Sequence, residues 1–78
     1  MKLVVTEVDL VGGEISIIDQ YDGDFLTLSR AMDYALDNRK QNNASLLITD
    51  IDHKICICNY MIDVEEWRFS AVAKKFLN

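Results

Sequence analysis

The sequence predicts an α+β fold in which two β-hairpins are each followed by a helix, in the order ββαββα. Val- and Ile-rich segments flank a Gly12-Gly13 turn, and apolar residues recur with helical spacing from Leu28. A second apolar hairpin then precedes an acidic helix-start motif at residues 63–66. The 78 residues form one domain, 1–78, with a small core.

The first hairpin is predicted over residues 3–11 and 14–21. Two consecutive glycines are typical of a type I′ turn, because glycine adopts positive φ without steric cost. The turn fixes the register, and with it the face that each side chain occupies. The pairs expected on the core face are Leu10 with Ile15, Val8 with Ile17, Thr6 with Asp19 and Val4 with Tyr21. The pairs expected on the mostly wet face are Asp9 with Ser16, Glu7 with Ile18 and Val5 with Gln20.

The first helix is predicted from Leu28 onward, with one apolar stripe facing the sheet. Thr27 is a candidate N-cap residue and Asp24 is its rival. Asn42 or Asn43 is expected to end the helix, since asparagine tolerates the left-handed conformation. The stripe residues, at i, i+3, i+4, i+7 and i+8, are Leu28, Ala31, Met32, Ala35 and Leu36.

The second hairpin is predicted over residues 45–51 and 54–61, around Asp52-His53. Asp50 is expected opposite Ile55, and Ile48 opposite Ile57. This register puts Leu47, Cys56 and Cys58 on the other face. Both strands are almost continuously apolar, which indicates that both faces are partly covered, as in a central strand or a dimer.

A second helix is predicted at the end of the chain. Asp63-Val64-Glu65-Glu66 matches a capping box, and Ile62 with Trp67 matches a hydrophobic staple. Phe69, Val72, Ala73 and Phe76 would form its inward stripe. With an ordinary crossover through the first helix, the four-stranded antiparallel sheet has the order 2-1-3-4 and both helices lie on one face.

Composition excludes several classes of protein. No apolar run exceeds four residues, far below the roughly 20 that a membrane span requires. Glu7 and Asp9 follow the N-terminal apolar residues too closely for a signal peptide. We therefore expect a cytoplasmic protein without membrane contact. Cys56 and Cys58 are two residues apart, at the outer limit of disulfide reach in a strand, and are expected to be free thiols.

The sequence offers no convincing catalytic or metal site. Residues 19–24 resemble a calcium loop in composition but place Ile18 and Ser29 where ligands are needed. Cys56, Cys58 and His53 lack a fourth zinc ligand, and His53 projects away from both thiols by strand parity. Asp50 and Asp52 are typical of a turn. We therefore expect no enzyme activity, no metal and no cofactor.

Charge is concentrated in the first half of the chain. Residues 1–37 carry eight acids and two bases, whereas residues 38–78 carry five acids and six bases. Direct nucleic-acid binding is not expected, because binding to phosphates depends on basic side chains. An acidic surface instead complements a basic groove. The residues expected to form this partner-binding acidic face are Asp19, Asp22, Asp24, Asp33 and Asp37.

The function expected from these features is non-catalytic binding to a larger protein or complex with a basic surface. In size and charge the chain resembles phage-encoded inhibitors of CRISPR and restriction systems, which implies occupation of a nucleic-acid-binding groove. The alternative is a structural or assembly subunit. In that case a homodimer would join through a sheet edge or through an apolar patch of Leu3, Val5 and Ile18.

Overall fold

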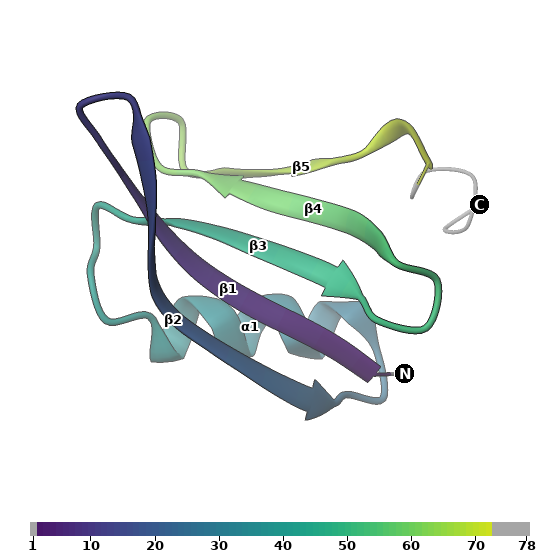
Figure 1. The fold of residues 1–78 in the computed structure, drawn as a ribbon. Coiled ribbons are helices and arrows are strands. Elements are labelled where there is room, and N and C mark those ends of the chain that lie inside the picture. The colour runs from purple at the N-terminus through teal and green to yellow at the C-terminus, as the bar shows by residue number, and fades with distance from the viewer. Residues whose placement is uncertain (1, 73–78) are drawn as a thin grey trace.

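The structure, a computed structural model that describes residues 2–72, is a five-stranded antiparallel sheet with a helix packed on one face (Figure 1). The elements are β1 (Lys2–Val11), β2 (Glu14–Asp24), α1 (Leu28–Asn38), β3 (Ser45–Asp50), β4 (Ile55–Met61) and β5 (Glu66–Phe69). The predicted α+β class is confirmed.

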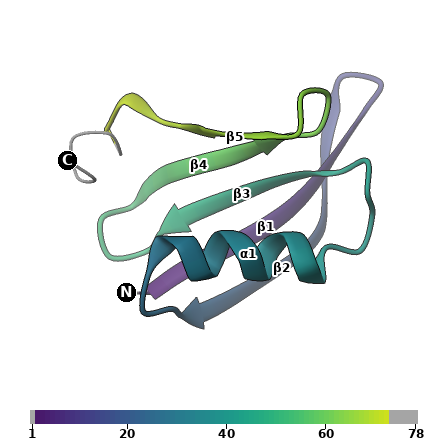
Figure 2. The ribbon, with the colours of Figure 1, turned by 180° about the vertical axis from the view of Figure 1, so that it is seen from behind.

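The strands lie in the order β2-β1-β3-β4-β5. The predicted order of the first four strands is therefore confirmed, and a fifth strand extends the sheet beyond β4. Figure 2 shows α1 from behind, lying across β1 and β3. Within residues 2–72, no helix has the length and apolar character needed to span a membrane.

Helix α1 follows the predicted pattern closely. Thr27 caps it, because its hydroxyl accepts a hydrogen bond from the backbone N–H of Arg30 at 3.2 Å. Leu28, Ala31 and Ala35 form the buried stripe. The helix ends at Asn38, earlier than expected, because the backbone of Arg39 is already extended.

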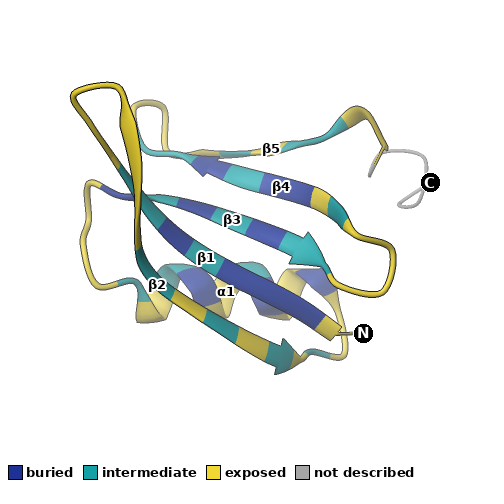
Figure 3. Ribbon diagram, viewed as in Figure 1, coloured by how far each residue is buried: buried dark blue, intermediate teal, exposed yellow. Residues whose placement is uncertain are grey.

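The core lies between α1 and one face of the sheet (Figure 3). Leu3 and Val5 of β1 and Leu46 and Ile48 of β3 are fully buried there. The predicted core face of the first hairpin was therefore wrong, because α1 covers the opposite side of β1. Alternation could not decide between the faces, since both sides of β1 carry valine.

The register of the first hairpin changes halfway along. The three predicted pairs nearest the turn are confirmed, Leu10 with Ile15, Asp9 with Ser16 and Val8 with Ile17. The register then shifts between Glu7 and Val8, so that Glu7 pairs with Asp19 and Val5 with Tyr21. The predicted pairs farther from the turn were wrong, because a β-bulge inserts Ile18 as an extra residue on β2.

A second irregularity occurs between β3 and β4. Asp50 pairs with Ile55 as predicted, but Ile48 pairs with Cys58 rather than with Ile57. Cys58 consequently lies in the core, on the face opposite to the one predicted. Ile57 is buried as well.

The prediction of a helix beginning at Asp63 was wrong. Residues 62–65 form a turn between β4 and β5, and Glu65 adopts a left-handed conformation with φ of 53°. In β5, Trp67 pairs with Tyr60, and the two rings pack edge to face with their centroids 5.3 Å apart. Tertiary pairing with β4 thus overrides the local capping signal. The backbone is helical at Ala71 and Val72, and the rest of the predicted helix lies outside the described residues.

Candidate functional site

Three strongly exposed apolar side chains lie together near the end of the β1–β2 hairpin. Leu10 is 70% exposed and its cross-strand partner Ile15 is 73% exposed. Ile17 is 64% exposed and lies two residues farther along the same face of β2. We call Leu10, Ile15 and Ile17 the hairpin patch. Exposed apolar residues that cluster in this way mark interaction surfaces, whereas scattered ones do not.

The predicted type I′ turn positions the patch. Gly12 and Gly13 have φ of 58° and 84°, and both fall in the region that the turn requires. The turn sets Leu10 directly opposite Ile15. The hairpin patch is thus placed by the sequence of the turn itself.

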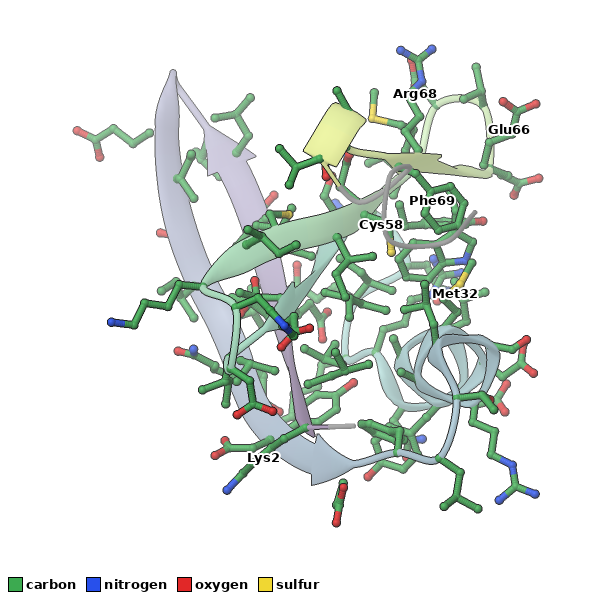
Figure 4. The ribbon with its side chains drawn as sticks, turned by 90° about the vertical axis from the view of Figure 1, so that its right-hand side faces the viewer. Lys2, Met32, Cys58, Glu66, Arg68 and Phe69 are labelled. Carbon is green, nitrogen blue, oxygen red and sulfur yellow. The ribbon has the colours of Figure 1, made fainter. Side chains whose placement is uncertain are left out.

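The hairpin extends beyond the rest of the sheet. Strand β3 pairs with β1 only from Leu3 to Val8, so residues 9–11 have β2 as their only neighbouring strand within the described part of the chain. A β-bulge bends a strand and increases its twist. Figure 4 shows the hairpin on the side of the sheet opposite α1, whereas Met32, Cys58 and Phe69 gather on the α1 side.

A buried carboxylate holds the base of the hairpin. Glu7 is 1% exposed, and its two carboxylate oxygens accept hydrogen bonds from the backbone N–H groups of Lys40 and Gln41 at 2.7 and 2.8 Å. The Lys40 ammonium also lies 3.2 Å from the carboxylate of Asp19, the partner of Glu7 on β2. The loop after α1 is thereby tied to both strands at the bulge.

The pKa of Asp19 reflects this contact. A side-chain hydrogen bond from Lys40 lowers the pKa of Asp19 below its usual value, and the backbone N–H of Gln20 lowers it further. Asp19 was predicted to bind a partner, but in the structure it is engaged by Lys40 within the same chain.

A groove of about 350 Å³ lies beside the hairpin. Its walls come from β1, from the start of β3 and from the turn between β4 and β5. The lining residues are Asp9, Leu10, Asn43, Ser45, Met61, Ile62 and Asp63. Leu10 therefore belongs both to the hairpin patch and to the rim of this groove.

The other predicted acidic residues form two groups that point in opposite directions. Asp22 is exposed and pairs with Val4, on the face of the sheet away from α1, and Asp24 lies two residues beyond it. Asp33 and Asp37 are exposed on α1, one turn apart and away from the buried stripe. The structure thus joins neighbouring acids in pairs but does not assemble all five predicted residues on one face.

The predicted apolar patch is not a surface feature of the described chain. Leu3 and Val5 are fully buried beneath α1, and Ile18 is half-buried at the bulge. These residues do not form a common exposed surface. The expectation that Leu3 and Val5 are exposed fails for the same reason as the core-face prediction.

The two cysteines are free thiols in different environments. Burial, together with a smaller contribution from the nearby Cys56, raises the pKa of the Cys58 thiol to about 12. Cys56 is exposed, and partial desolvation also raises its pKa. Neither thiol is activated as a nucleophile, because nucleophilic cysteines have lowered pKa values.

Asp50 stabilises the turn between β3 and β4. One of its oxygens accepts the backbone N–H groups of Asp52 and His53, and the other lies 2.8 Å from Nδ1 of His53. Burial opposes ionisation of Asp50, but the hydrogen bond from His53 prevails and the pKa of Asp50 is lowered. Among residues 2–72, no group of three or more His, Cys, Asp or Glu side chains is arranged to hold a metal ion.

The hairpin patch is not predicted from the sequence, because the predicted register places these side chains on the core face. One signal was present: the first predicted strand, 3–11, is longer than the predicted strand 45–51 that pairs with it. An overhanging hairpin lacks a third strand and cannot bury its apolar side chains as a central strand does.

Comparison of the chain with protein-family models, with curated proteins and with solved structures finds no significant match.

Proposed function

We propose that this protein is a non-catalytic interaction module that binds a protein partner through the hairpin patch. The observation that carries the proposal is the exposure of Leu10, Ile15 and Ile17 on one face of a projecting hairpin. Burying exposed apolar surface against a partner stabilises a complex by roughly 25 cal/mol for each Å² removed from water. The hairpin patch is therefore a surface whose burial against a partner would stabilise a complex.

The base of the hairpin favours binding without a large entropic cost. The Glu7 carboxylate fixes the loop at Lys40 and Gln41 to β1, and Lys40 in turn contacts Asp19 of β2. A binding surface that is already ordered loses less conformational freedom on association. The anchored hairpin can present its apolar side chains without first folding around a partner.

Site-specific photo-crosslinking in cells of the source organism tests the proposal. A photoreactive amino acid replaces Ile15 in one variant and Val64 in a control, since Val64 is an exposed aliphatic residue in the turn between β4 and β5. We expect a defined protein adduct from position 15 and none from position 64. Equal labelling from both positions, or no adduct from position 15, would contradict the proposal.

A second candidate function is inhibition of a partner by occupation of its basic nucleic-acid-binding groove. It is favoured by the opposite directions of the two acidic pairs, Asp22 with Asp24 and Asp33 with Asp37. A groove has two walls, and a two-layer domain inserted between them would present carboxylates to both. Complementary charge of this kind accelerates association and fixes orientation.

Charge reversal separates the two candidates. In a variant with Asp22, Asp33 and Asp37 replaced by lysine, groove occupation predicts a large loss of affinity for the crosslinked partner and a flatter dependence on salt. Binding through the hairpin patch predicts little change in either quantity, because screening acts on charges and not on apolar contacts. Affinity measured across a salt series decides between them.

A further inference from the structure

We propose that two copies of this chain associate through the outer edges of their β2 strands, antiparallel and related by a two-fold axis at Ser16. The inference rests on the proposed function and names the partner of the hairpin patch as a second copy. Three features of β2 support this association: its open edge, its outward-pointing backbone hydrogen-bonding groups and a register that complements itself.

The outer edge of β2 is open within the described chain. Strand β2 is the first strand of the sheet order, so β1 is its only neighbour there. Cross-strand pairs alternate between hydrogen-bonded and non-hydrogen-bonded, and the type I′ turn makes Val11 with Glu14 a hydrogen-bonded pair. Ile15 and Ile17 are therefore in non-hydrogen-bonded pairs, and their N–H and C=O groups point away from β1.

The centre of the open edge lacks the usual features that prevent edge-to-edge pairing. Natural edges carry charged side chains, proline or β-bulges, whereas residues 15–17 read Ile-Ser-Ile, between Glu14 and the β-bulge at Ile18. The β-bulge ends the segment, and just beyond it the backbone N–H of Gln20 already donates a hydrogen bond to the Asp19 carboxylate. Pairing is thus confined to five residues of each β2 strand, and the more acidic part of β2 lies outside it.

The segment complements itself about Ser16. In an antiparallel pair centred there, Ser16 faces Ser16 of the second copy, and Ile15 faces Ile17 of the second copy. The outward N–H and C=O groups of Ile15 then form two hydrogen bonds with those of Ile17 in the second copy, as in a hydrogen-bonded antiparallel pair. Glu14 faces Ile18, so no like charges stand opposite each other. Moving the axis to Ile17 would place Ile15 opposite Asp19 and lose this match.

The same register joins the two hairpin patches. Ile15 and Ile17 lie on the face that also carries Leu10. The two-fold axis therefore brings Leu10, Ile15 and Ile17 of both copies onto one continuous sheet face. A two-fold interface uses the same surface on both subunits. Here the outer edges of both β2 strands are buried, and Ile15 and Ile17 of each copy contact Ile17 and Ile15 of the other along this face.

Sedimentation of the purified protein over a dilution series tests the association. We expect the wild-type mass to shift from dimer toward monomer on dilution. Ile17→Lys should be monomeric throughout, because it places a charge in the pairing segment. The control Val64→Lys also replaces an exposed aliphatic residue with lysine, but at a position far from β2 in sequence. It should sediment as the wild type does. A monomeric wild type, or an Ile17→Lys variant that still dimerises, would overturn the proposal.

Disulfide trapping tests the register independently of stability. In a Cys56→Ser background, Ser16→Cys should form a covalent dimer on mild oxidation, since facing residues in a non-hydrogen-bonded pair come within disulfide reach. Glu14→Cys, which faces Ile18, should remain monomeric. Equal trapping at both positions, or none at position 16, would overturn the register. A monomeric chain whose position 15 still crosslinks to a different protein in cells would refute the dimer but retain the interaction module.

Discussion

The carboxylate of Glu7 lies 2.7 Å from the backbone nitrogen of Lys40, although the two residues are 33 positions apart in the chain. Glu7 is nearly inaccessible to solvent, and its second oxygen accepts the N–H of Gln41. A buried carboxylate requires such partners, because an unpaired one is costly to desolvate. This contact closes the loop after α1 onto β1, at the level where the hairpin begins to project.

Replacing Glu7 with alanine is expected to lower the free energy of unfolding by about 2–3 kcal/mol, because two backbone N–H groups then lose a charged acceptor. Glu7→Gln should have an intermediate effect, since its amide oxygen still accepts a hydrogen bond. Glu14→Ala is the matched control on the exposed end of β2. Urea denaturation measures all three, and equal midpoints for Glu7→Ala and Glu14→Ala would contradict the role assigned to Glu7.

The Gly12-Gly13 turn predicts a graded response to substitution. Gly12 has φ of 58°, and a Cβ there meets no neighbouring atom, so any cost arises from the backbone. Gly12→Val should destabilise the protein by on the order of 1 kcal/mol or more, whereas Gly12→Asn should have a smaller effect, because asparagine tolerates the left-handed region. Thermal unfolding of both variants checks the order, and the opposite order would exclude the type I′ geometry.

We expect the raised pKa of Tyr21 to lower the free energy of unfolding at alkaline pH. Its hydroxyl oxygen is buried without a hydrogen-bond partner in the described structure, and burial raises the pKa of Tyr21 to about 12, with Tyr34 adding to the shift. The folded pKa exceeds the unfolded value of about 10. The unfolded chain therefore loses its proton first, and the stability is full below pH 10 and declines as pH rises toward 12.

Tyr21→Phe tests this interpretation directly. The variant should be as stable as the wild type or more stable at neutral pH, because it removes a buried hydroxyl without a partner. Its unfolding free energy should also decline less between pH 10 and 12, the interval set by the raised pKa of Tyr21. Parallel alkaline stability curves for the two proteins would show that Tyr21 titrates normally.

The two thiols should react at different rates with an alkylating reagent. Cys56 is exposed, whereas Cys58 is 1% exposed and burial raises its pKa to about 12. Since the thiolate is the nucleophile, Cys56 should be modified first and Cys58 only on unfolding. Mass spectrometry of peptides from partly alkylated protein gives the order, and modification of Cys58 at the rate of Cys56 would contradict the placement of Cys58 in the core.

The sequence predicted those elements whose local signal agreed with the tertiary structure. The Gly12-Gly13 turn and the cap at Thr27 appear as expected, because each depends on residues adjacent in the chain. The order of the first four strands follows from the handedness and length of the connections. Where long-range pairing favoured a different structure from the local signal, as at Asp63, the structure follows the long-range pairing.

The errors concerning the candidate site have a common physical origin. Strand β1 carries apolar residues on both faces, and the face of Glu7 is the one predicted to be mostly wet. In the structure that face is the core, because Lys40 and Gln41 supply the hydrogen bonds that make a buried carboxylate tolerable. Those partners lie more than 30 residues away in sequence, and no pattern within the strand could indicate them. Exchanging the faces also moved Leu10, Ile15 and Ile17 from the expected core to the surface.

Amide hydrogen exchange of individual β2 residues at high and low protein concentration is the most direct test of the hairpin as a self-association surface. The N–H groups of Ile15 and Ile17 point away from β1, whereas that of Ser16 bonds to Asp9 within the hairpin. We expect Ile15 and Ile17 to be protected at high concentration and to exchange rapidly on dilution, with Ser16 protected at both concentrations. Rapid exchange of Ile15 and Ile17 at every concentration would contradict the account.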